Sequence, residues 1–189
     1  EERRSGLYAS NGALLALVKR SDPARPLPDL FIFAVLGLFR GYHPGYSGIF
    51  ARNHNYLTWL VLKAHTGNQG GRVRLRSADP RDVPDINFHY FDEGTDTRDE
   101  DLESVVDGIR FVRTLLEPIR EFVETEEVPG RAIQSHGQLR DFVKDNAWGH
   151  HASCSCPIGA DDDPMAVLDG DFRVRGVDNL RVVDASVFP

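Results

Sequence analysis

Apolar residues occur along this chain in two kinds of spacing, and each kind predicts a different element. Residues 30–39 and 56–64 are apolar runs rich in phenylalanine and β-branched side chains, and we interpret both as strands, although a buried helix also fits such a pattern. Around residues 72–76 and 86–90 apolar and polar positions alternate, as in strands with one solvated face. We therefore expect residues 30–91 to form an antiparallel meander of about four strands, with 56–64 and 73–75 paired as a hairpin.

Helical spacing is clearest over residues 99–122, where apolar side chains recur every three or four positions and fall on one stripe. Thr97 and Glu100 fit a capping box at the start of this helix. Pro118 should kink or end it, because proline lacks the backbone N–H that the helix needs.

Two shorter segments also have helical spacing. Residues 137–146 follow Ser135 and Gln138, which fit a second capping box. Residues 7–20 predict a third helix, capped by Ser10 or Asn11.

The last section of the chain changes character. Residues 172–174 and 180–183 alternate on either side of a turn and predict a β-hairpin. Together the elements predict an α+β fold, with a mostly antiparallel sheet of about four to six strands, helices packed on one of its faces, and a carboxyl-terminal hairpin.

Composition narrows the class of protein. The chain has 189 residues, of which 41% are hydrophobic and 27% charged, as in globular proteins with a real core. A net charge of -7 argues against nucleic acid as a partner, because nucleic-acid-binding domains carry a basic face. We expect no membrane span, since the longest apolar run is far shorter than the roughly 20 residues needed. No signal peptide is visible, so we expect a cytoplasmic protein. The chain begins at Glu1 instead of a methionine and stops at Pro189 directly after an apolar run, so we expect it to be part of a longer protein.

The densest group of reactive side chains comprises His150, His151, Cys154 and Cys156. By count they match a zinc site, but structural zinc sites present two separated pairs of ligands, so a metal is the less favoured interpretation. A nucleophilic thiol with a histidine base is a second interpretation. The small residues around both cysteines favour a third, a pair of buried and inert thiols.

Asp184 directly follows the last predicted strand. Because cofactors in α/β sheets bind outside the carboxyl ends of strands, this position is typical of a cofactor ligand. The alternative is an acid in a turn that accepts hydrogen bonds from its own backbone. A glycine-rich dinucleotide-binding loop is absent from the sequence, since Gly41, Gly45 and Gly48 lack the G-x-G-x-x-G spacing.

The carboxyl-terminal residues resemble those of the glucose–methanol–choline (GMC) oxidoreductases, which are FAD-dependent alcohol dehydrogenases and oxidases. That family typically carries H-x-x-G-T-x-x-M-G, and residues 151–159 read His-Ala-Ser-Cys-Ser-Cys-Pro-Ile-Gly, with Cys154 where glycine is usual. Its later pattern L-R-V-x-G-V-x-x-L-R-V-x-D-A-S-x-x-P is matched closely by residues 172–189. A weaker match to G-x-V-x-L-x-S-x-D-P begins at Gly71.

The resemblance implies oxidation of the CH–OH group of a small alcohol by hydride transfer to FAD. His151 matches the family's catalytic histidine and would act as general base, with His150 as the second candidate. The residues that match flavin contacts are Asp184, Ala185, Ala152, Ser153 and Leu168.

The resemblance also implies that the chain contributes to two domains with different roles. Residues 1–147 would belong to a substrate-binding domain and residues 148–189 to a Rossmann-like FAD-binding domain. The family's glycine-rich loop lies near its amino terminus, so an amino-terminal FAD-binding portion of the same protein would be a partner of this chain. The alternative from another class is a non-catalytic binding or interaction module.

Overall fold

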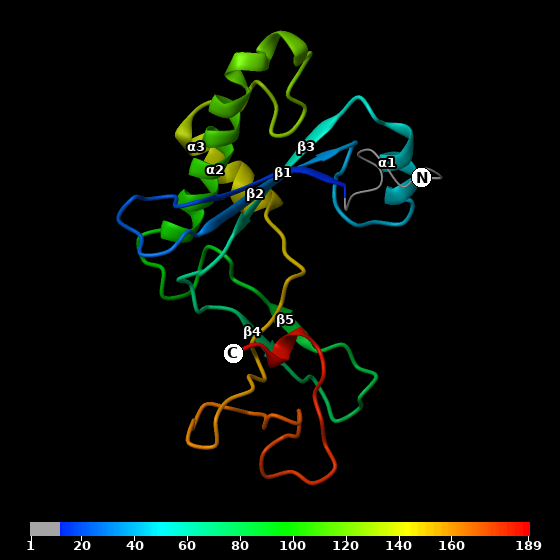
Figure 1. Cartoon of the computed structure of the whole chain (residues 1–189), viewed down its shortest axis with the longest axis vertical. Coiled ribbons are helices and arrows are strands. Elements are labelled where there is room, and N and C mark those ends of the chain that lie inside the picture. Colours follow the sequence, from blue (N-terminus) through cyan, green and yellow to red (C-terminus); the bar gives the residue numbers. More distant parts are fainter. Residues whose placement is uncertain (1–11) are drawn as a thin grey trace. The chain divides into compact units, whose positions relative to one another are not determined.

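The computed structural model describes residues 12–189, and the chain divides into two compact units between Asn146 and Ala147 (Figure 1). The larger unit contains all the strands and the α-helices of the described residues. The predicted α+β class is confirmed. The strands lie in two separate sheets, however, so the single predicted meander is wrong.

The first sheet is antiparallel, with the strand order β1-β2-β3. Its strands are β1 (Ala13–Lys19), β2 (Leu30–Leu36) and β3 (Leu57–Lys63). Along β2, Ile32 is fully buried whereas its neighbour Phe31 is 40% exposed, so one face of the sheet is covered and the other is open. The strands predicted within residues 30–39 and 56–64 are confirmed.

Strand β1 corrects the helix expected over residues 7–20. Residues 13–19 pair with β2 in antiparallel register, with Leu17 opposite Ile32. Residues 7–11 and the expected cap lie outside the described residues. A short apolar segment fits a helix or a strand by pattern alone, and pairing with a buried neighbour favours the strand.

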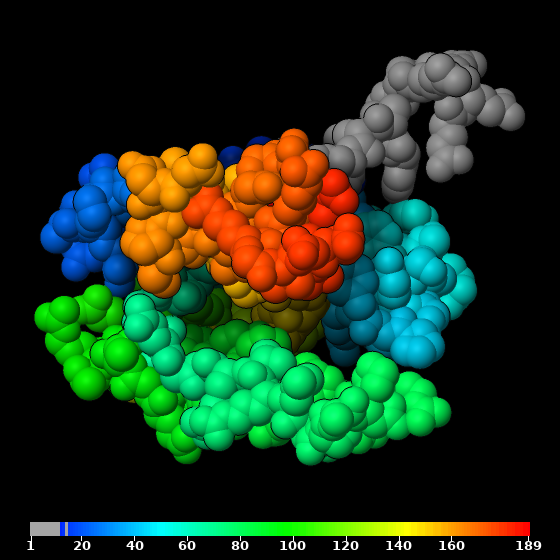
Figure 2. Space-filling view, turned by 90° about the horizontal axis from the view of Figure 1, so that it is seen from below, coloured from blue at the N-terminus to red at the C-terminus, as the bar shows by residue number. Residues whose placement is uncertain are grey.

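The second sheet consists of β4 (Arg72–Arg74) and β5 (Asp85–Asn87), which pair with each other and are exposed along their whole length (Figure 2). The predicted hairpin between 56–64 and 73–75 is therefore wrong. After β3 the chain turns towards a helix instead, because the backbone N–H groups of Gly67 and Asn68 donate to the Asp101 carboxylate at 2.8–3.0 Å.

The long predicted helix is confirmed as α2 (Glu100–Leu116), followed by a 3-10 segment, η2 (Glu117–Phe122). Pro118 lies at the start of that segment, so it ends the α-helix as expected. The capping box with Thr97 is wrong. The Asp96 carboxylate instead accepts hydrogen bonds from the backbone N–H groups of Glu100 and Asp101, at 2.9 and 2.8 Å. A carboxylate can bind two N–H groups at once, and its charge is favourable at a helix amino terminus.

The second predicted helix is α3 (His136–Asn146), and its capping box is confirmed. The Gln138 N–H donates to Ser135 Oγ at 3.2 Å, and the Ser135 N–H donates to Gln138 Oε1 at 2.9 Å. A further short helix, α1 (Tyr46–Arg52), was not predicted. Among the described residues, no helix combines the length and apolar character needed to cross a membrane.

Helix α2 contributes to two buried clusters in the larger unit, one on each side of the helix. Towards the sheet, its Val112 packs with Leu30 and Ile32. Towards α3, a second buried cluster joins the two helices and consists of Leu102, Val106, Leu139 and Val143. The sheet, α2 and α3 therefore form successive layers, visible in Figure 1.

Gly108 brings α2 close to strand β3. A Cβ atom added there would lie 2.5 Å from Cγ1 of Val61. We expect Gly108→Ala to destabilise the larger unit by about 1–3 kcal/mol, because this overlap outweighs the better helix propensity of alanine. Urea denaturation measures the change.

Gly137 provides the matched control, because a Cβ added there meets nothing within 4 Å. Gly137→Ala should be neutral or slightly stabilising. Adding Val61→Ala to Gly108→Ala should cost less than the sum of the two single changes. Additive losses would contradict the close contact as the cause.

A buried group of charges holds the loops of the larger unit to α2. Lys63 Nζ lies 3.6 Å from Asp29 Oδ2 and 3.4 Å from Asp101 Oδ1, and the three side chains are only 6%, 2% and 3% exposed. Asp29 also accepts from the backbone and hydroxyl of Ser21, at 2.7 and 2.6 Å, and lies 2.9 Å from Arg25 Nε. Burial raises the pKa of Asp29, but these hydrogen bonds and nearby cations outweigh it and lower the pKa below its ordinary value.

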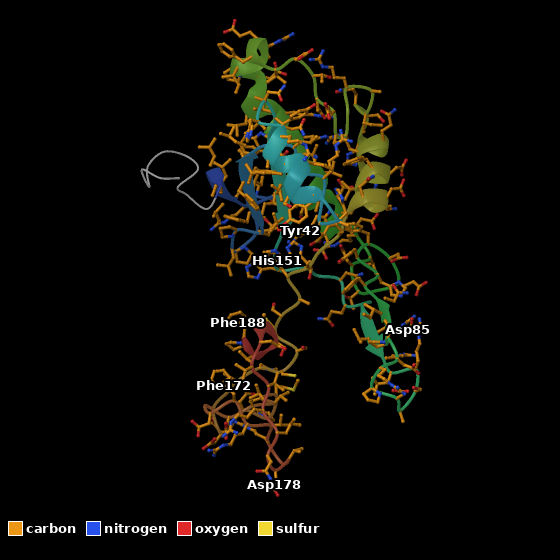
Figure 3. The ribbon with its side chains drawn as sticks, turned by 90° about the vertical axis from the view of Figure 1, so that its right-hand side faces the viewer. Tyr42, Asp85, His151, Phe172, Asp178 and Phe188 are labelled. Atoms are coloured by element: carbon orange, nitrogen blue, oxygen red, sulfur yellow. The ribbon has the colours of Figure 1, made fainter. Side chains whose placement is uncertain are left out.

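The smaller unit, residues 147–189, has one 3-10 segment, η3 (Ala185–Val187), and is held mainly by backbone hydrogen bonds. The predicted hairpin forms as an irregular pair: the Val174 N–H donates to Leu180 O at 3.0 Å, and the Val182 N–H donates to Phe172 O at 3.2 Å. Asp178 lies near its tip (Figure 3). That this hairpin belongs to a Rossmann-like domain stays a prediction.

Candidate functional site

All the predicted site residues fall within the smaller unit, and His151 is exposed in it (Figure 3). The His151 ring packs edge-on against His150, with the centroids 4.4 Å apart. His150 in turn stacks on Trp148 at 5.1 Å, with the ring planes 21° apart. The stacked pair therefore supports the His151 imidazole from one side.

The segment after His151 runs alongside the segment after Asp184. Three backbone N–H groups cross between them: Cys154 donates to Ala185 O at 3.3 Å, Cys156 to Ser186 O at 2.9 Å, and Ile158 to Val187 O at 3.0 Å. The structure thus brings together two predicted site segments that are about 30 residues apart in the sequence.

Asp184 caps η3 with its own side chain. Its Oδ1 accepts from the Ser186 N–H at 2.8 Å and from the Ser186 hydroxyl at 2.5 Å. These hydrogen bonds, the one from the hydroxyl first, lower the pKa of Asp184, so the group is ionised at neutral pH. The interpretation as a turn acid is confirmed, and the role in cofactor binding stays a prediction. Within the described chain, Asp184 Oδ2 and the Ala185 N–H have no hydrogen-bond partner.

The other residues predicted to contact flavin differ sharply in exposure. Ala152 and Ser153 are exposed, whereas Leu168 is completely buried. Leu168 forms the core of the smaller unit, where it makes backbone bridges to Ile158 and Val174. The Leu168 side chain can therefore support a binding surface through packing but cannot itself contact a ligand.

The two cysteines are free thiols, Cys154 exposed and Cys156 partly buried. The interpretation as buried, inert thiols is therefore wrong for Cys154. The neighbouring histidines and the cysteines do not gather as metal ligands in the described residues.

One group of three potential metal ligands does occur within the described part of the chain, namely His89, Asp92 and Glu93. The sequence pattern did not single it out. The available signal was a histidine followed by two acids within five positions, at the end of the strand predicted over residues 86–90.

Comparison with known proteins identifies the family. Residues 67–189 match the family model of the GMC oxidoreductases. The chain belongs to the GMC oxidoreductase family. It is 46% identical over 122 residues to the oxygen-dependent choline dehydrogenase of Vibrio vulnificus, covering 63% of this chain and 21% of that protein. It is 41% identical over 135 residues to the oxygen-dependent choline dehydrogenase of Pseudomonas syringae pv. tomato, covering 68% and 22%. The chain thus spans about a fifth of the length of these curated relatives.

The position at which this GMC chain departs from the usual glycine has a strained backbone. Cys154 has a φ of +68°, in the left-handed region that favours glycine. The family's glycine is thereby explained, because a Cβ at such a φ costs about 1–2 kcal/mol.

Cys154→Gly is therefore expected to stabilise the smaller unit by about 0.5–1 kcal/mol, the relief of strain being partly offset by a more flexible unfolded chain. Denaturation in a Trp59→Phe background, where fluorescence reports on Trp148 in the smaller unit, measures the change. Cys154→Ala is the control, because it removes the thiol but keeps the Cβ. A gain of equal size in both variants would show that the thiol, and not the backbone, is responsible.

Proposed function

We propose that this chain is the carboxyl-terminal part of an FAD-dependent oxidoreductase that oxidises the CH–OH group of a small alcohol. The observation that carries the proposal is the pairing of residues 154–158 with residues 185–187, beside an exposed His151. Choline is the first substrate to test, because the relatives are named as choline dehydrogenases. The amino-terminal FAD-binding portion of the same protein is the proposed partner.

The residues around Asp184 fit a flavin nucleotide in their chemistry. The Ala185 N–H has no acceptor within the described chain and can donate to a phosphate or ribityl oxygen. The ionised Asp184 keeps one oxygen open to accept from a ribityl or ribose hydroxyl. Ala152, Ser153, Asp184 and Ala185 would hold the flavin nucleotide, with Leu168 supporting that surface from beneath. When bound, FAD supplies the hydride acceptor.

His151 would accept the proton of the substrate hydroxyl. As the O–H bond breaks, its proton would pass to an imidazole nitrogen, and the electron pair left on oxygen would form the carbonyl while the carbon loses its hydrogen as a hydride to the acceptor that bound FAD supplies. A histidine suits this step because imidazole exchanges a proton near neutral pH. Trp148 and His150 would keep the ring oriented through their stack.

The test uses the full-length protein. We expect it to purify with the absorption bands of oxidised flavin, and anaerobic addition of choline should bleach them. Tetramethylammonium is the matched control, since it carries the same quaternary nitrogen without a hydroxyl and should leave the bands unchanged. A colourless full-length protein would overturn the FAD proposal and favour the non-catalytic module. A coloured protein that choline does not bleach would overturn choline as the substrate.

A further inference from the structure

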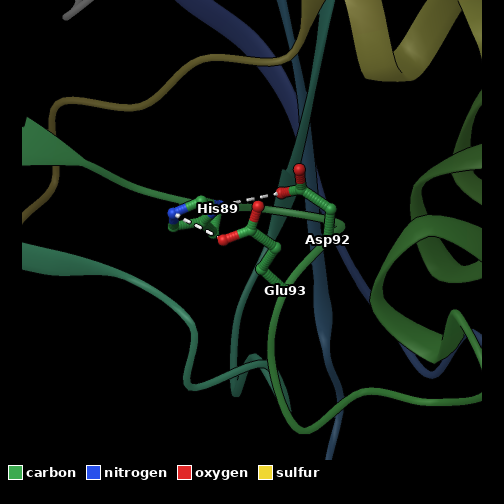
Figure 4. Close-up of side chains that lie close together, drawn as sticks. All are labelled: His89, Asp92 and Glu93. Carbon is green, nitrogen blue, oxygen red and sulfur yellow. Dashed lines mark hydrogen bonds and ion pairs between the residues drawn. The ribbon is translucent and has the colours of Figure 1, made fainter.

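His89, Asp92 and Glu93 lie together in the loop that follows β5 (Figure 4). Their nearest ligand atoms are all within 4.8 Å of one another. The group belongs to the larger unit and includes none of the residues proposed for catalysis. Both carboxylates are exposed, Asp92 to 71% and Glu93 to 64%, so an ion from solvent can reach them.

The decisive feature is the buried imidazole. The His89 side chain is only 7% exposed, and Nδ1 lies 3.3 Å from Asp92 Oδ1 in a hydrogen bond. Nε2 is buried and has no hydrogen-bond partner, although Glu93 Oε2 lies 3.5 Å away. Buried polar atoms nearly always have a partner, so a buried nitrogen that faces a carboxylate and makes no hydrogen bond needs an explanation, and a bound cation is one.

We propose that His89 Nε2 and the Glu93 carboxylate bind a divalent transition-metal ion such as Zn²⁺, with Asp92 positioning the imidazole. An Nδ1–H that donates to Asp92 leaves a lone pair on Nε2, directed at a negatively charged carboxylate. That arrangement is repulsive unless a cation lies between them. Two ligands of one tetrahedral ion, each about 2.0–2.1 Å from it, are about 3.3–3.4 Å apart, close to the separation of Nε2 and Oε2.

The choice of ion follows from the ligand types. Imidazole nitrogen favours zinc, copper and nickel over magnesium and calcium, which prefer oxygen. A carboxylate bonded to the second nitrogen of a ligating histidine is the common arrangement at zinc sites. Water would complete the coordination, because the exposed carboxylates leave the outer side open.

The loop is held in shape by groups that would not bind the ion. The Asn68 side chain donates to His89 O at 2.5 Å and to Asp92 O at 3.2 Å, and it accepts from the Asp96 N–H at 3.3 Å. The separation of His89 from Glu93 is therefore fixed from outside the cluster. One competing cation is close, since Arg72 Nη2 lies 3.9 Å from Glu93 Oε2, but its side chain is 47% exposed and can turn away.

The experiment is calorimetric titration of Zn²⁺ into the full-length protein after treatment with a chelator. We expect one ion per chain at micromolar affinity. Glu93→Gln should weaken binding at least tenfold, and Asp92→Asn by about 10- to 100-fold. Glu121→Gln, which changes an exposed acid elsewhere, and Arg72→Gln, which removes the competing cation, should not weaken it. Circular dichroism confirms that each variant is folded.

Two further measurements keep the assignment to this cluster falsifiable. Cu²⁺ bound in the same place should give an electron paramagnetic resonance spectrum with coupling to one imidazole nitrogen, lost in His89→Gln. The double variant Cys154→Ser and Cys156→Ser should keep full zinc affinity. Loss of zinc in that variant, or unchanged affinity in Glu93→Gln, would overturn the proposal. Failure of the wild type to bind zinc below millimolar concentration would also overturn it. None of these outcomes depends on flavin reduction.

Discussion

Replacing Asp29 by alanine is expected to destabilise the larger unit by about 3–5 kcal/mol. The side chain is 2% exposed and accepts from the Ser21 backbone and hydroxyl, while Arg25 and Lys63 supply positive charge beside it. Its removal leaves buried donors without an acceptor and leaves Lys63 with Asp101 as its remaining carboxylate. Unpaired buried donors and charges are among the costliest defects that a single substitution creates.

The measurement must separate the two units, because their unfolding need not coincide. Trp59 lies in β3 and Trp148 in the smaller unit, so a Trp148→Phe background makes fluorescence report on the larger unit alone. In urea, Asp29→Ala should lower the denaturation midpoint strongly. Asp141→Ala, an exposed acid on α3, should change the unfolding free energy by less than about 0.5 kcal/mol. A loss below about 1 kcal/mol for Asp29→Ala would contradict the proposed importance of the buried charges.

Asp101, another member of this buried group of charges, shows why the strands were predictable but their pairing was not. The runs at 30–39 and 56–64 were correctly assigned as strands because they are rich in phenylalanine and β-branched side chains, which favour strands. The path of the chain after β3 depends on Asp101, an acid more than 30 positions later, which binds the backbone of Gly67 and Asn68. Such a contact between distant residues leaves no local pattern, so the hairpin prediction failed.

Competition between neighbouring residues for the same role explains the error at the start of α2. Thr97 and Asp96 are both suitable caps for α2, and the sequence pattern favoured Thr97 through its spacing to Glu100. The carboxylate of Asp96 binds two backbone N–H groups instead. Residues 13–19 form a strand through their pairing with β2, which their own spacing did not reveal. By contrast, Pro118 acts through its own ring, and its effect was predicted correctly.

The sequence predicted the candidate site residues of the smaller unit but not those of the larger unit. In the smaller unit the family pattern named His151 and Asp184 together, and their segments are joined by backbone hydrogen bonds. In the larger unit the His89 group was missed. The sequence offers only a histidine followed by two acids, and the feature that distinguishes them, the burial of one imidazole nitrogen of His89, cannot be seen in a sequence.

Replacing His151 by alanine is expected to slow flavin reduction by the alcohol about 100- to 10,000-fold in the full-length protein. The reason is that the hydroxyl proton would lose its acceptor, and an alcohol that keeps this proton is a poor hydride donor. Anaerobic stopped-flow absorbance at saturating alcohol measures the step directly. The flavin content should be unchanged, because the segments proposed to hold FAD are joined by backbone groups that the substitution leaves in place.

His150→Ala is the matched control, since this neighbour contacts His151 through ring packing. Its loss should slow reduction less than about tenfold, because a proton acceptor remains while its support is weakened. Added imidazole should restore part of the rate in His151→Ala, where it can occupy the vacated space, and none in His150→Ala. A larger loss in His150→Ala than in His151→Ala would exchange the two assignments. Equal, small losses in both would mean that the base lies outside this segment.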